Sequence, residues 1–398
     1  MNEMSYLEKL LDGVHVEWKS LGEVASLRRG RVMSKGYLID NMGKYPVYSS
    51  QTANNGKIGS IDTFDFDGEY ISWTTDGANA GTVFYRTGKF SITNVCGLIK
   101  INEEEVVINY KYLFYWLTIE AKKHVYSGMG NPKLMSHQVE KIPVPIPCLN
   151  NPEESLAIQS QIVQILDTFT ALTAELTAEL TAELSMRKKQ YNYYRDQLLS
   201  FEENKVEWKT LGEIAEYAKA RISFDLLDKN SYVGVDNLLQ NCAGKMQSNY
   251  VPTSGNLTEF REGDILIGNI RPYLKKIWQA DSLGGTNGDV LVIRSCNESL
   301  LSRYLYHILA DDKFFEYNMQ HAKGAKMPRG NKTAILKYRI PIPSIDEQTR
   351  IVAILDKFDT LTKSINEGLP REIELRQKQY EYYRDMLFSF PKPEVAEA

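Results

Sequence analysis

The sequence predicts an α+β molecule built from two copies of one unit, each a mixed α/β domain followed by a long helix. Three observations support this fold class. They are an internal repeat of about 190 residues, strand-and-turn patterns inside each copy, and helical periodicity after each domain. At 398 residues the chain is long enough for two or three domains with cores of their own.

Four pairs of matching segments make up the repeat. They are 16–25 with 206–215, 142–147 with 338–343, 159–169 with 348–358, and 187–201 with 376–390. The last pair, RKKQYNYYRDQLLSF and RQKQYEYYRDMLFSF, is identical at 11 of 15 positions. Agreement of this extent indicates a molecule with an internal pseudo-twofold repeat.

Between the matching segments the two copies diverge, and residues 26–138 and 216–334 share only a skeleton. Both stretches contain runs of β-branched and aromatic residues separated by glycine turns, which is typical of strands. The segments around Tyr112 and Tyr304 have helical spacing, and we expect their aromatic side chains to lie in a core. The two domains are therefore predicted to share a fold and to present equivalent surfaces, and their different side chains indicate different binding targets.

Long helices are predicted over Glu153–Phe201 and Ile345–Phe390, where apolar residues recur at a spacing close to 3.5. Gly368–Pro370 should kink or break the second helix, because proline removes a backbone donor. About 45 helical residues would span roughly 65–70 Å. Residues 173–184 repeat Thr-Ala-Glu-Leu three times. This run is predicted to be a helical spacer.

The spacer has a matched counterpart in length. Asp167 and Arg187 are separated by 20 residues, as are Asp356 and Arg376. This agreement suggests that the two helices act as a ruler, that is, they set a fixed distance between the two domains. The sequence therefore divides into a first domain (1–147), a central helical spacer (148–204), a second domain (205–343) and a C-terminal helical region (344–398).

Composition and the absence of motifs exclude several classes of protein. No apolar run approaches the length of a membrane helix, and the N-terminus lacks the pattern of a signal peptide, so we expect a cytoplasmic protein. Four scattered cysteines predict neither a metal site nor a disulfide framework. No Walker nucleotide motif, dinucleotide fingerprint or catalytic triad spacing is present, so we expect no catalytic residues and no enzyme activity of the chain alone.

Positive charge is local rather than general. The net charge of −4 by itself argues against a nucleic-acid binder, but acid-free basic stretches occur in both domains. The candidate DNA-binding residues of the first domain are Arg28, Arg29, Arg31, Lys35, Asn131 and Lys133. Those of the second domain are Lys219, Arg221, Lys323, Lys326, Arg329, Asn331 and Lys332. Residues 76–81 and 269–271 are weaker candidates.

A set of aromatic and arginine residues is identical between the two helices, and such residues often anchor interfaces. The candidates for partner docking are Tyr191, Tyr194, Arg195, Tyr380, Tyr383 and Arg384. Packing between the two helices explains the same identity, and the sequence does not separate the two explanations.

Over essentially its full length the chain resembles the specificity subunits of type I restriction–modification enzymes. The resemblance rests on two dissimilar domains, the Pro-x-Pro segments, the Gln-x-x-Ile-Val-x-Ile-Leu-Asp motif that opens each helix, and the Thr-Ala-Glu-Leu run. The last feature resembles a subgroup in which the number of repeats varies. The resemblance implies that each domain is a target recognition domain for one half of a bipartite, asymmetric site in double-stranded DNA, and that the two helices pack antiparallel.

It also implies partners for the helices. Two methyltransferase subunits would dock there, and motor–nuclease subunits would join the complex. S-adenosylmethionine, ATP and Mg²⁺ would belong to those partners, with no cofactor in this chain.

Two alternatives stay open on the residues alone. A stand-alone DNA-acting enzyme would need the nucleotide or cofactor motifs that are missing. A coiled-coil scaffold with protein- or sugar-binding domains is disfavoured, modestly, by the acid-free basic stretches.

Overall fold

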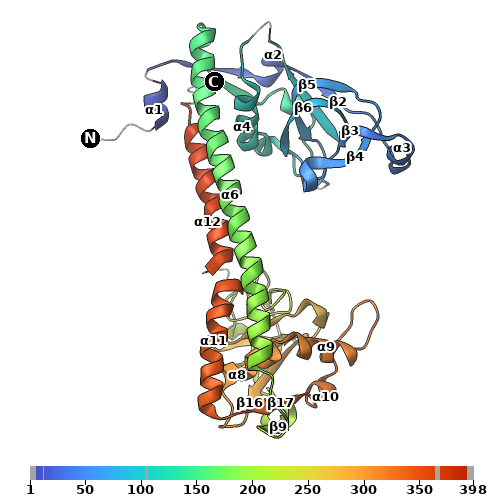
Figure 1. Cartoon of the computed structure of the whole chain (residues 1–398), viewed down its shortest axis with the longest axis vertical. Coiled ribbons are helices and arrows are strands. Elements are labelled where there is room, and N and C mark those ends of the chain that lie inside the picture. The colour runs from blue at the N-terminus through green and yellow to red at the C-terminus, as the bar shows by residue number, and fades with distance from the viewer. Residues whose placement is uncertain (1–5, 12, 104–105, 129, 364–367, 392–398) are drawn as a thin grey trace. The chain divides into compact units, whose positions relative to one another are not determined.

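The computed structural model describes residues 6–11, 13–103, 106–128, 130–363 and 368–391. They form two compact units (Figure 1). The first unit holds the chain up to Glu175 together with the residues from Gln377 onward, and the second holds Leu176–Arg376. Both boundaries fall inside long helices, so each unit combines one domain with parts of both helical regions.

The elements of the first half follow in chain order. They are α1 (Tyr6–Leu11), β1 (Val16–Ser20), α2 (Leu21–Val24), β2 (Ala25–Arg29), α3 (Lys35–Asp40), β3 (Met42–Tyr48), the 3-10 turn η1 (Ala53–Gly56), β4 (Lys57–Ile61), β5 (Phe66–Thr74), β6 (Val83–Ile92), β7 (Cys96–Ile101), α4 (Tyr110–Glu120), η2 (Ala121–His124), α5 (Ser136–Val139), β8 (Pro143–Pro147) and α6 (Pro152–Leu198).

The second half repeats this plan. Its elements are β9 (Glu207–Thr210), α7 (Leu211–Ile214), β10 (Ala215–Tyr217), β11 (Arg221–Ser223), η3 (Phe224–Leu226), β12 (Asn256–Phe260), β13 (Ile265–Gly268), η4 (Pro272–Leu274), β14 (Ile277–Gln279), β15 (Gly284–Thr286), β16 (Val290–Ser295), α8 (Ser302–Leu309), α9 (Asp312–Gln320), α10 (Lys332–Ile335), β17 (Arg339–Ile342), α11 (Ile345–Lys363) and α12 (Gly368–Leu387).

The main sheets of the two halves share one strand order. In the first half a six-stranded sheet runs β2-β7-β5-β6-β3-β4, and in the second a four-stranded sheet runs β10-β16-β13-β14. The first four strands of the larger sheet therefore match the smaller sheet one for one, and these strands pair antiparallel in both. This shared order confirms the predicted α+β fold with an internal repeat.

A small two-stranded sheet in each half explains the Pro-x-Pro repeat. β1 pairs with β8 so that Trp18 lies opposite Pro145, and β9 pairs with β17 so that Trp208 lies opposite Pro341. Proline donates no ladder hydrogen bond, so it is tolerated where a strand lies at an edge. In both halves these ribbons lead directly into the long helices.

A buried glutamine fixes the start of each long helix to its domain. Gln159 and Gln348 have no exposed surface. The carboxamide oxygen of Gln159 accepts a hydrogen bond from the Asn109 amide at 2.8 Å, and that of Gln348 accepts one from the Leu301 amide at 2.9 Å. Buried amides need such partners, which explains why glutamine recurs at this position of the motif.

The helix ends differ from the sequence-based boundaries. Helices were expected to run to Phe201 and Phe390, but α6 ends at Leu198 and α12 at Leu387. Phe388 and Phe390 are instead buried in the core of the first unit, and Phe201 packs against the core of the second. The hydrophobic effect explains this difference, because burying a large aromatic side chain outweighs extending a helix by one turn.

Helix packing is antiparallel within each unit, as expected (Figure 1). In the first unit the start of α6 packs on the end of α12, with the rings of Phe169 and Tyr383 5.7 Å apart. In the second the end of α6 packs on α11, where the Tyr191 ring lies 5.9 Å from Phe358. At the predicted interruption Gly368 has a φ of 77°, outside the right-handed helical region. The structure describes α11 to Lys363 and α12 from Gly368, and residues 364–367 lie outside the described residues.

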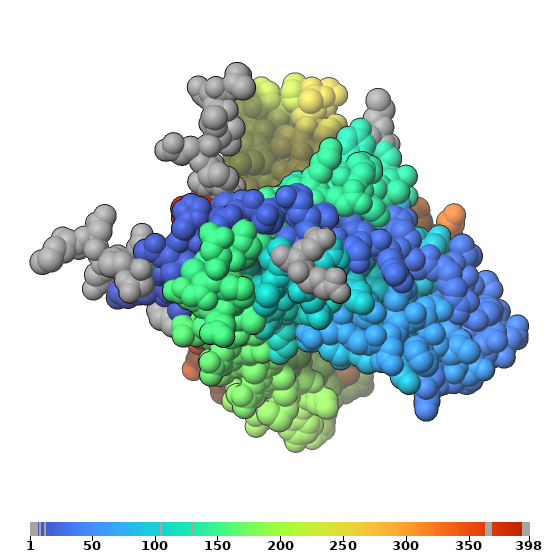
Figure 2. Space-filling model, turned by 90° about the horizontal axis from the view of Figure 1, so that it is seen from above, coloured from blue at the N-terminus to red at the C-terminus, as the bar shows by residue number. Residues whose placement is uncertain are grey.

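The surface of the first unit is seen in Figure 2, where the start of α6 (green) lies beside the N-terminal segment (blue). Val16 of that segment and Ile158 of α6 belong to one hydrophobic core. Among the helices in the described part of the chain, none combines the length and hydropathy that crossing a bilayer requires.

Candidate nucleic-acid interface

Three loops of the first domain form a connected row. They are the β3–β4 loop (residues 49–56), the β5–β6 loop (residues 75–82) and the basic loop (described residues 126–128 and 130–133). The Asn79 amide group donates to the Ser50 carbonyl at 3.2 Å, joining the first two loops. The Gly77 amide donates to the Pro132 carbonyl at 3.0 Å, joining the second and third. The row carries Asn131 and Lys133, both exposed.

The basic end of β2 lies against the same row. Arg29 donates to the Asn94 carbonyl at 3.2 Å, and Arg31 forms a backbone bridge with Thr93. The Thr93 hydroxyl in turn lies 2.9 Å from the Ser49 hydroxyl at the root of the β3–β4 loop. The structure therefore brings Arg29 and Arg31 together with the loops, although about 20–100 residues separate them in the chain.

The other two basic candidates of the first domain, Arg28 and Lys35, have no such connection to the row of loops. Arg28 is exposed, and because side chains alternate along a strand it projects from the opposite face of β2 to Arg29. Lys35 is the first residue of α3 and is exposed. Neither is joined to the loop row by a contact comparable to that of Arg29.

The second domain holds its basic loop in the same way. Residues 323–329 close through a backbone bridge between Lys323 and Arg329, as Tyr126 and Lys133 do in the first domain. The Arg271 amide donates to the Pro328 carbonyl at 2.7 Å, just as Gly77 donates to Pro132. Arg329 is therefore the structural counterpart of Lys133. The two loops are equivalent, and most of the side chains that they expose differ.

Charge pairing distinguishes the basic candidates. Arg329 forms an ion pair with Asp289 at 2.7 Å, and Lys219 pairs with Glu216 at 2.9 Å. Arg31 pairs with Asp65 at 3.0 Å, and the hydrogen bonds that it donates to Tyr37 and Asp65 raise the pKa of its guanidinium. All three cations are exposed, so water screens these pairs and a phosphate can compete for them.

Asn331 of the second domain caps α10, because its carboxamide oxygen accepts from the Thr333 and Ala334 amides at 3.1 and 3.2 Å. These two bonds use only the oxygen of the side chain, and a DNA contact of Asn331 stays a prediction. Lys332 follows at the start of α10 with an exposed side chain, and its carbonyl accepts from the Tyr217 hydroxyl at 2.9 Å.

Two more residues keep their candidacy. Arg221 donates to the Thr258 hydroxyl at 3.1 Å and remains exposed on β11. Lys326 is exposed at the tip of the second basic loop. Together with Lys323, these residues present guanidinium and ammonium groups that can contact phosphates, and arginine can also reach base edges.

Comparison with known proteins identifies the fold's family. The family model for the type I restriction modification DNA specificity domain matches the chain twice, over residues 14–186 and 203–375. The chain belongs to this family. The two matches coincide with the two copies of the internal repeat.

Relatives over the full length support the assignment. The EcoR124I/EcoR124II specificity subunit of Escherichia coli is 38% identical over 428 residues, covering 99% of this chain and 99% of the relative. A putative type I specificity subunit of Mycoplasma pneumoniae is 32% identical, with 92% of this chain and 96% of the relative covered. The chain is thus a type I specificity subunit, the DNA-recognition component expected from the sequence rather than an enzyme.

Solved structures share the fold at low sequence identity. A type I system S subunit from M. genitalium has a TM-score of 0.50 at 17% identity, over 98% of this chain and 100% of that one. A chain from a structure on complex assembly and conformational transition of the type I R-M system has a TM-score of 0.58 at 14% identity, over 94% and 97% of the two chains.

The docking candidates of this specificity subunit separate into two groups. Tyr191 and Arg195 are 1% and 4% exposed, so the expectation that they dock a partner is corrected. Arg195 instead lies between Asp311 and Asp312, at 3.7 and 3.6 Å. These contacts hold α6 onto the second domain.

The other docking candidates remain accessible. Tyr194 is 42% exposed and Tyr383 is 37% exposed. Tyr380 is half-buried and accepts a hydrogen bond from Thr170 at 3.1 Å, and Arg384 pairs with its neighbour Asp385 at 2.7 Å. Tyr383 borders a groove of about 510 Å³ between α6 and α12 in the first unit. The groove is lined by Gln164, Ile165, Thr168, Phe169, Tyr383, Met386 and Leu387.

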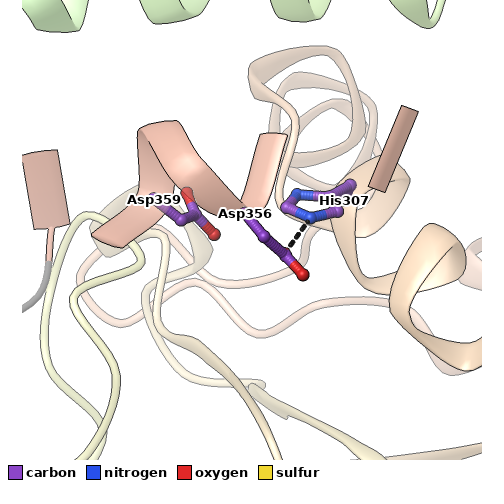
Figure 3. A group of neighbouring side chains, drawn as sticks. All are labelled: His307, Asp356 and Asp359. Atoms are coloured by element: carbon purple, nitrogen blue, oxygen red, sulfur yellow. Dashed lines mark hydrogen bonds and ion pairs between the residues drawn. The ribbon is translucent and has the colours of Figure 1, made fainter. Parts of the chain in front are cut away.

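One cluster in the second unit has the composition of a metal site, although the sequence predicted none. His307, Asp356 and Asp359 offer ligand atoms within 4.8 Å of one another, and His307 points at Asp356 (Figure 3). Arg303, however, already pairs with Asp356 at 2.6 Å and approaches Asp359 at 3.6 Å. Arg303 therefore compensates part of the negative charge of the cluster, with one guanidinium for two carboxylates.

The first unit has the same arrangement without an imidazole. Lys111 pairs with Asp167 at 2.6 Å, and the Tyr115 hydroxyl donates to Asp167 at 2.7 Å and contacts Thr170 at 3.3 Å. These positions match those of the His307 cluster in the repeat. We therefore interpret both clusters as anchors between a helix and its domain, and we call them the helix anchors.

Sequence reasoning missed the β3–β4 loop and the arginine beneath it, Arg86. The loop carries Asn54, Asn55 and Gly56, and this Asn-Asn-Gly run was the available signal, because these residues tolerate left-handed backbone conformations. Arg86 gave no comparable signal, since it lies inside a predicted strand rather than in a basic loop.

Proposed function

We propose that this specificity subunit reads a bipartite, asymmetric sequence in double-stranded DNA, with one half-site for each domain. The observation that carries the proposal is the equivalence of the two basic loops. Both loops close through the same backbone contacts and present Asn131 and Lys133 in one domain, but Met327 and Arg329 in the other. Two equivalent surfaces with different side chains favour two different half-sites.

The cations on these loops fit phosphate contacts. Lys323 and Lys326 are exposed, and in the first domain Arg29 and Lys133 are exposed beside the loop row. Phosphate contacts depend on local charge, so a net charge of −4 is compatible with DNA binding. A protein- or sugar-binding scaffold would not require this repeated placement of cations.

The helices are proposed to set the spacing between the half-sites and to dock two methyltransferase subunits. Each Thr-Ala-Glu-Leu unit adds about 6 Å of helix, against roughly 3.4 Å per base pair, so one unit corresponds to at most one to two base pairs. Tyr194, Tyr380, Tyr383 and Arg384 remain the docking candidates. This role matches the division into domains 1–147 and 205–343, spacer 148–204 and helical region 344–398, and the variable-repeat subgroup.

The chemistry is assigned to the partners. S-adenosylmethionine would serve the methyltransferases, and ATP and Mg²⁺ the motor–nuclease subunits, in the cytoplasm. This chain would then supply only recognition and geometry to the complex.

Charge removal on the second basic loop tests DNA binding. We expect Lys326→Ala with Arg329→Ala to weaken duplex binding and to reduce the slope of log affinity against log salt by up to about two, because each phosphate contact contributes about 0.9. Titration of the full chain with duplex DNA over a series of salt concentrations measures this slope. Lys188→Ala with Lys189→Ala, two exposed lysines of α6, is the charge-matched control. An unchanged slope for the loop variant would reject the phosphate contacts.

Deletion of one Thr-Ala-Glu-Leu unit, residues 177–180, tests the ruler. The spacer between half-sites should shorten by one or two base pairs while both half-sites stay the same, because the domains themselves are untouched. Mapping of methylated adenines in a host that expresses the whole complex measures spacer and half-sites together. A change in the half-sites themselves would contradict this role of the helix.

A further inference from the structure

The β3–β4 loop of the first domain is held in a defined conformation. Asn54 and Asn55 both adopt left-handed backbone angles, with φ of 51° and 53°, and Gly56 follows with φ of 80°. The Ser49 amide donates to the Gly56 carbonyl at 2.9 Å, and the Gln51 amide group donates to the Lys57 carbonyl at 2.6 Å. These bonds close the loop at its root and leave Asn54 and Asn55 exposed at its tip.

Arg86 lies directly beneath this loop and is 3% exposed. Its guanidinium stacks 3.6 Å from the Tyr48 ring centroid, and its Nε donates to the Ser72 hydroxyl at 3.0 Å. A methyl group added at Gly56 would come within 3.1 Å of Arg86 Nη2, so loop and guanidinium are in close contact.

The charge of Arg86 is uncompensated. Among the described residues no carboxylate pairs with it, and its Nη1 has no hydrogen-bond partner. Burial lowers the pKa of this arginine to about 10, so the guanidinium is still protonated at neutral pH. A buried cation that lacks a carboxylate and leaves one donor unpaired is costly, which favours a role in binding over a role in folding.

The second domain shows that the fold does not need this arginine. Strand pairing aligns Ile71 with Ile265, since both lie opposite an isoleucine of the next strand. The same pairing aligns Arg86 with Ala280 and Ser72 with Leu266. Ala280 and Leu266 belong to a hydrophobic cluster. The buried polar group is therefore specific to the first domain, as a residue that serves one half-site should be.

We propose that the β3–β4 loop reads base edges in the half-site of the first domain, and that Arg86 is its positioning residue, a fixed positive charge that draws the DNA backbone onto the loop. The proposal rests on the proposed function. Carboxamides pair in bidentate fashion with adenine, so Asn54 and Asn55 are the reading residues.

Asn54→Gly with Asn55→Gly tests the reading residues. Glycine adopts left-handed angles without strain, so the loop keeps its backbone and loses only the carboxamides. We expect about a 5- to 150-fold loss of discrimination at one or two positions of the first half-site, with the second half-site read as before. Competition binding of the full chain, with each base of a bipartite duplex substituted in turn, measures both halves at once.

Asn241→Gly is the matched control, because Asn241 is an exposed asparagine of the second domain with φ of 56°. It should leave discrimination in the first half-site unchanged. Unchanged discrimination in the Asn54 and Asn55 variant, or an equal loss in both half-sites, would overturn the proposal. Failure of the unsubstituted chain to prefer any bipartite duplex would instead refute the proposed function.

Arg86→Ala tests the positioning residue against a structural one. We expect about a 5- to 100-fold weaker complex with poorer discrimination in the first half-site, partly restored by Arg86→Lys. The salt slope should fall by up to about one, and the unfolding midpoint should be unchanged or higher. Lower stability with equal losses in both half-sites would show that Arg86 serves the fold alone, and would overturn its proposed role.

Discussion

The two helix anchors occupy equivalent positions but use different chemistry. The first unit joins Lys111 and Tyr115 to Asp167, and the second joins Arg303 and His307 to Asp356. Both arrangements place one cation and one neutral donor on the same aspartate. The repeat therefore preserves a pattern of donors and an acceptor, while the donors themselves are free to change. In the second unit one donor is ionisable near neutral pH, so this anchor gains a sensitivity to pH that the first lacks.

The last residues of the matching segments 187–201 and 376–390 differ in burial. Phe388 is 5% exposed in the first unit, with its ring 5.4 Å from Tyr112 and 5.7 Å from Trp116. Its counterpart in the second unit, Leu199, is only half-buried. A shared sequence motif thus contributes unequally to the two cores.

The largest expected effect follows from this inequality. Phe388→Ala should lower the free energy of unfolding by about 3–5 kcal/mol, because it removes a buried aromatic side chain and leaves a cavity. Leu199→Ala should cost clearly less. Chemical denaturation of the full chain, monitored by fluorescence of tryptophans in each unit, measures both. Equal losses would show that the ends of the two segments are equivalent after all.

Arginine pairs provide the next comparison. Arg195→Ala removes a buried cation from between Asp311 and Asp312 and should destabilise the second unit by about 2–4 kcal/mol, because the buried Asp311 carboxylate loses its ion-pair partner. Asp312 keeps its ion pair with Lys275 at 2.7 Å. Arg384→Ala, its counterpart in the repeat, breaks a more exposed pair with Asp385 and should cost less than about 1 kcal/mol. Thermal unfolding of both variants checks the order, and a larger loss for Arg384→Ala would contradict it.

The smallest effect concerns pH. Burial lowers the pKa of His307, although the hydrogen bond with Asp356 opposes the shift. The unfolded chain therefore binds the proton more readily than the folded one, so the free energy of unfolding should fall as the pH drops below about 6.5, by at most about 1.4 kcal/mol per pH unit.

His307→Tyr is the matched variant, because tyrosine occupies this position in the first unit. It should keep a donor for Asp356 and flatten the pH dependence between about 7 and 5. Tyr115→His should introduce the same dependence into the first unit. Stability that varies with pH identically in the His307→Tyr variant and the unsubstituted chain would rule out His307 as its source.

Much of the architecture could be predicted, because segments that match between the two copies of the repeat mark the elements common to both domains. The prolines of the small sheets and the left-handed backbone at Gly368 follow local rules of backbone conformation. The basic loops could be predicted as well, since Lys323 to Lys332 form one acid-free stretch. The TAEL run was correctly assigned to a helix, because its residues are strong helix formers.

The sequence by itself determined the family, the duplicated α+β fold and the basic segments. Only the tertiary structure decided that Tyr191 and Arg195 are buried while Tyr194 and Tyr383 are exposed, since identical motifs differ only in what packs against them. It also decided that Phe390 belongs to a core rather than a helix, and that Arg86 lies beneath a loop about 30 residues away in sequence. Burial and charge pairing are properties of contacts between distant residues, and local sequence patterns do not encode them.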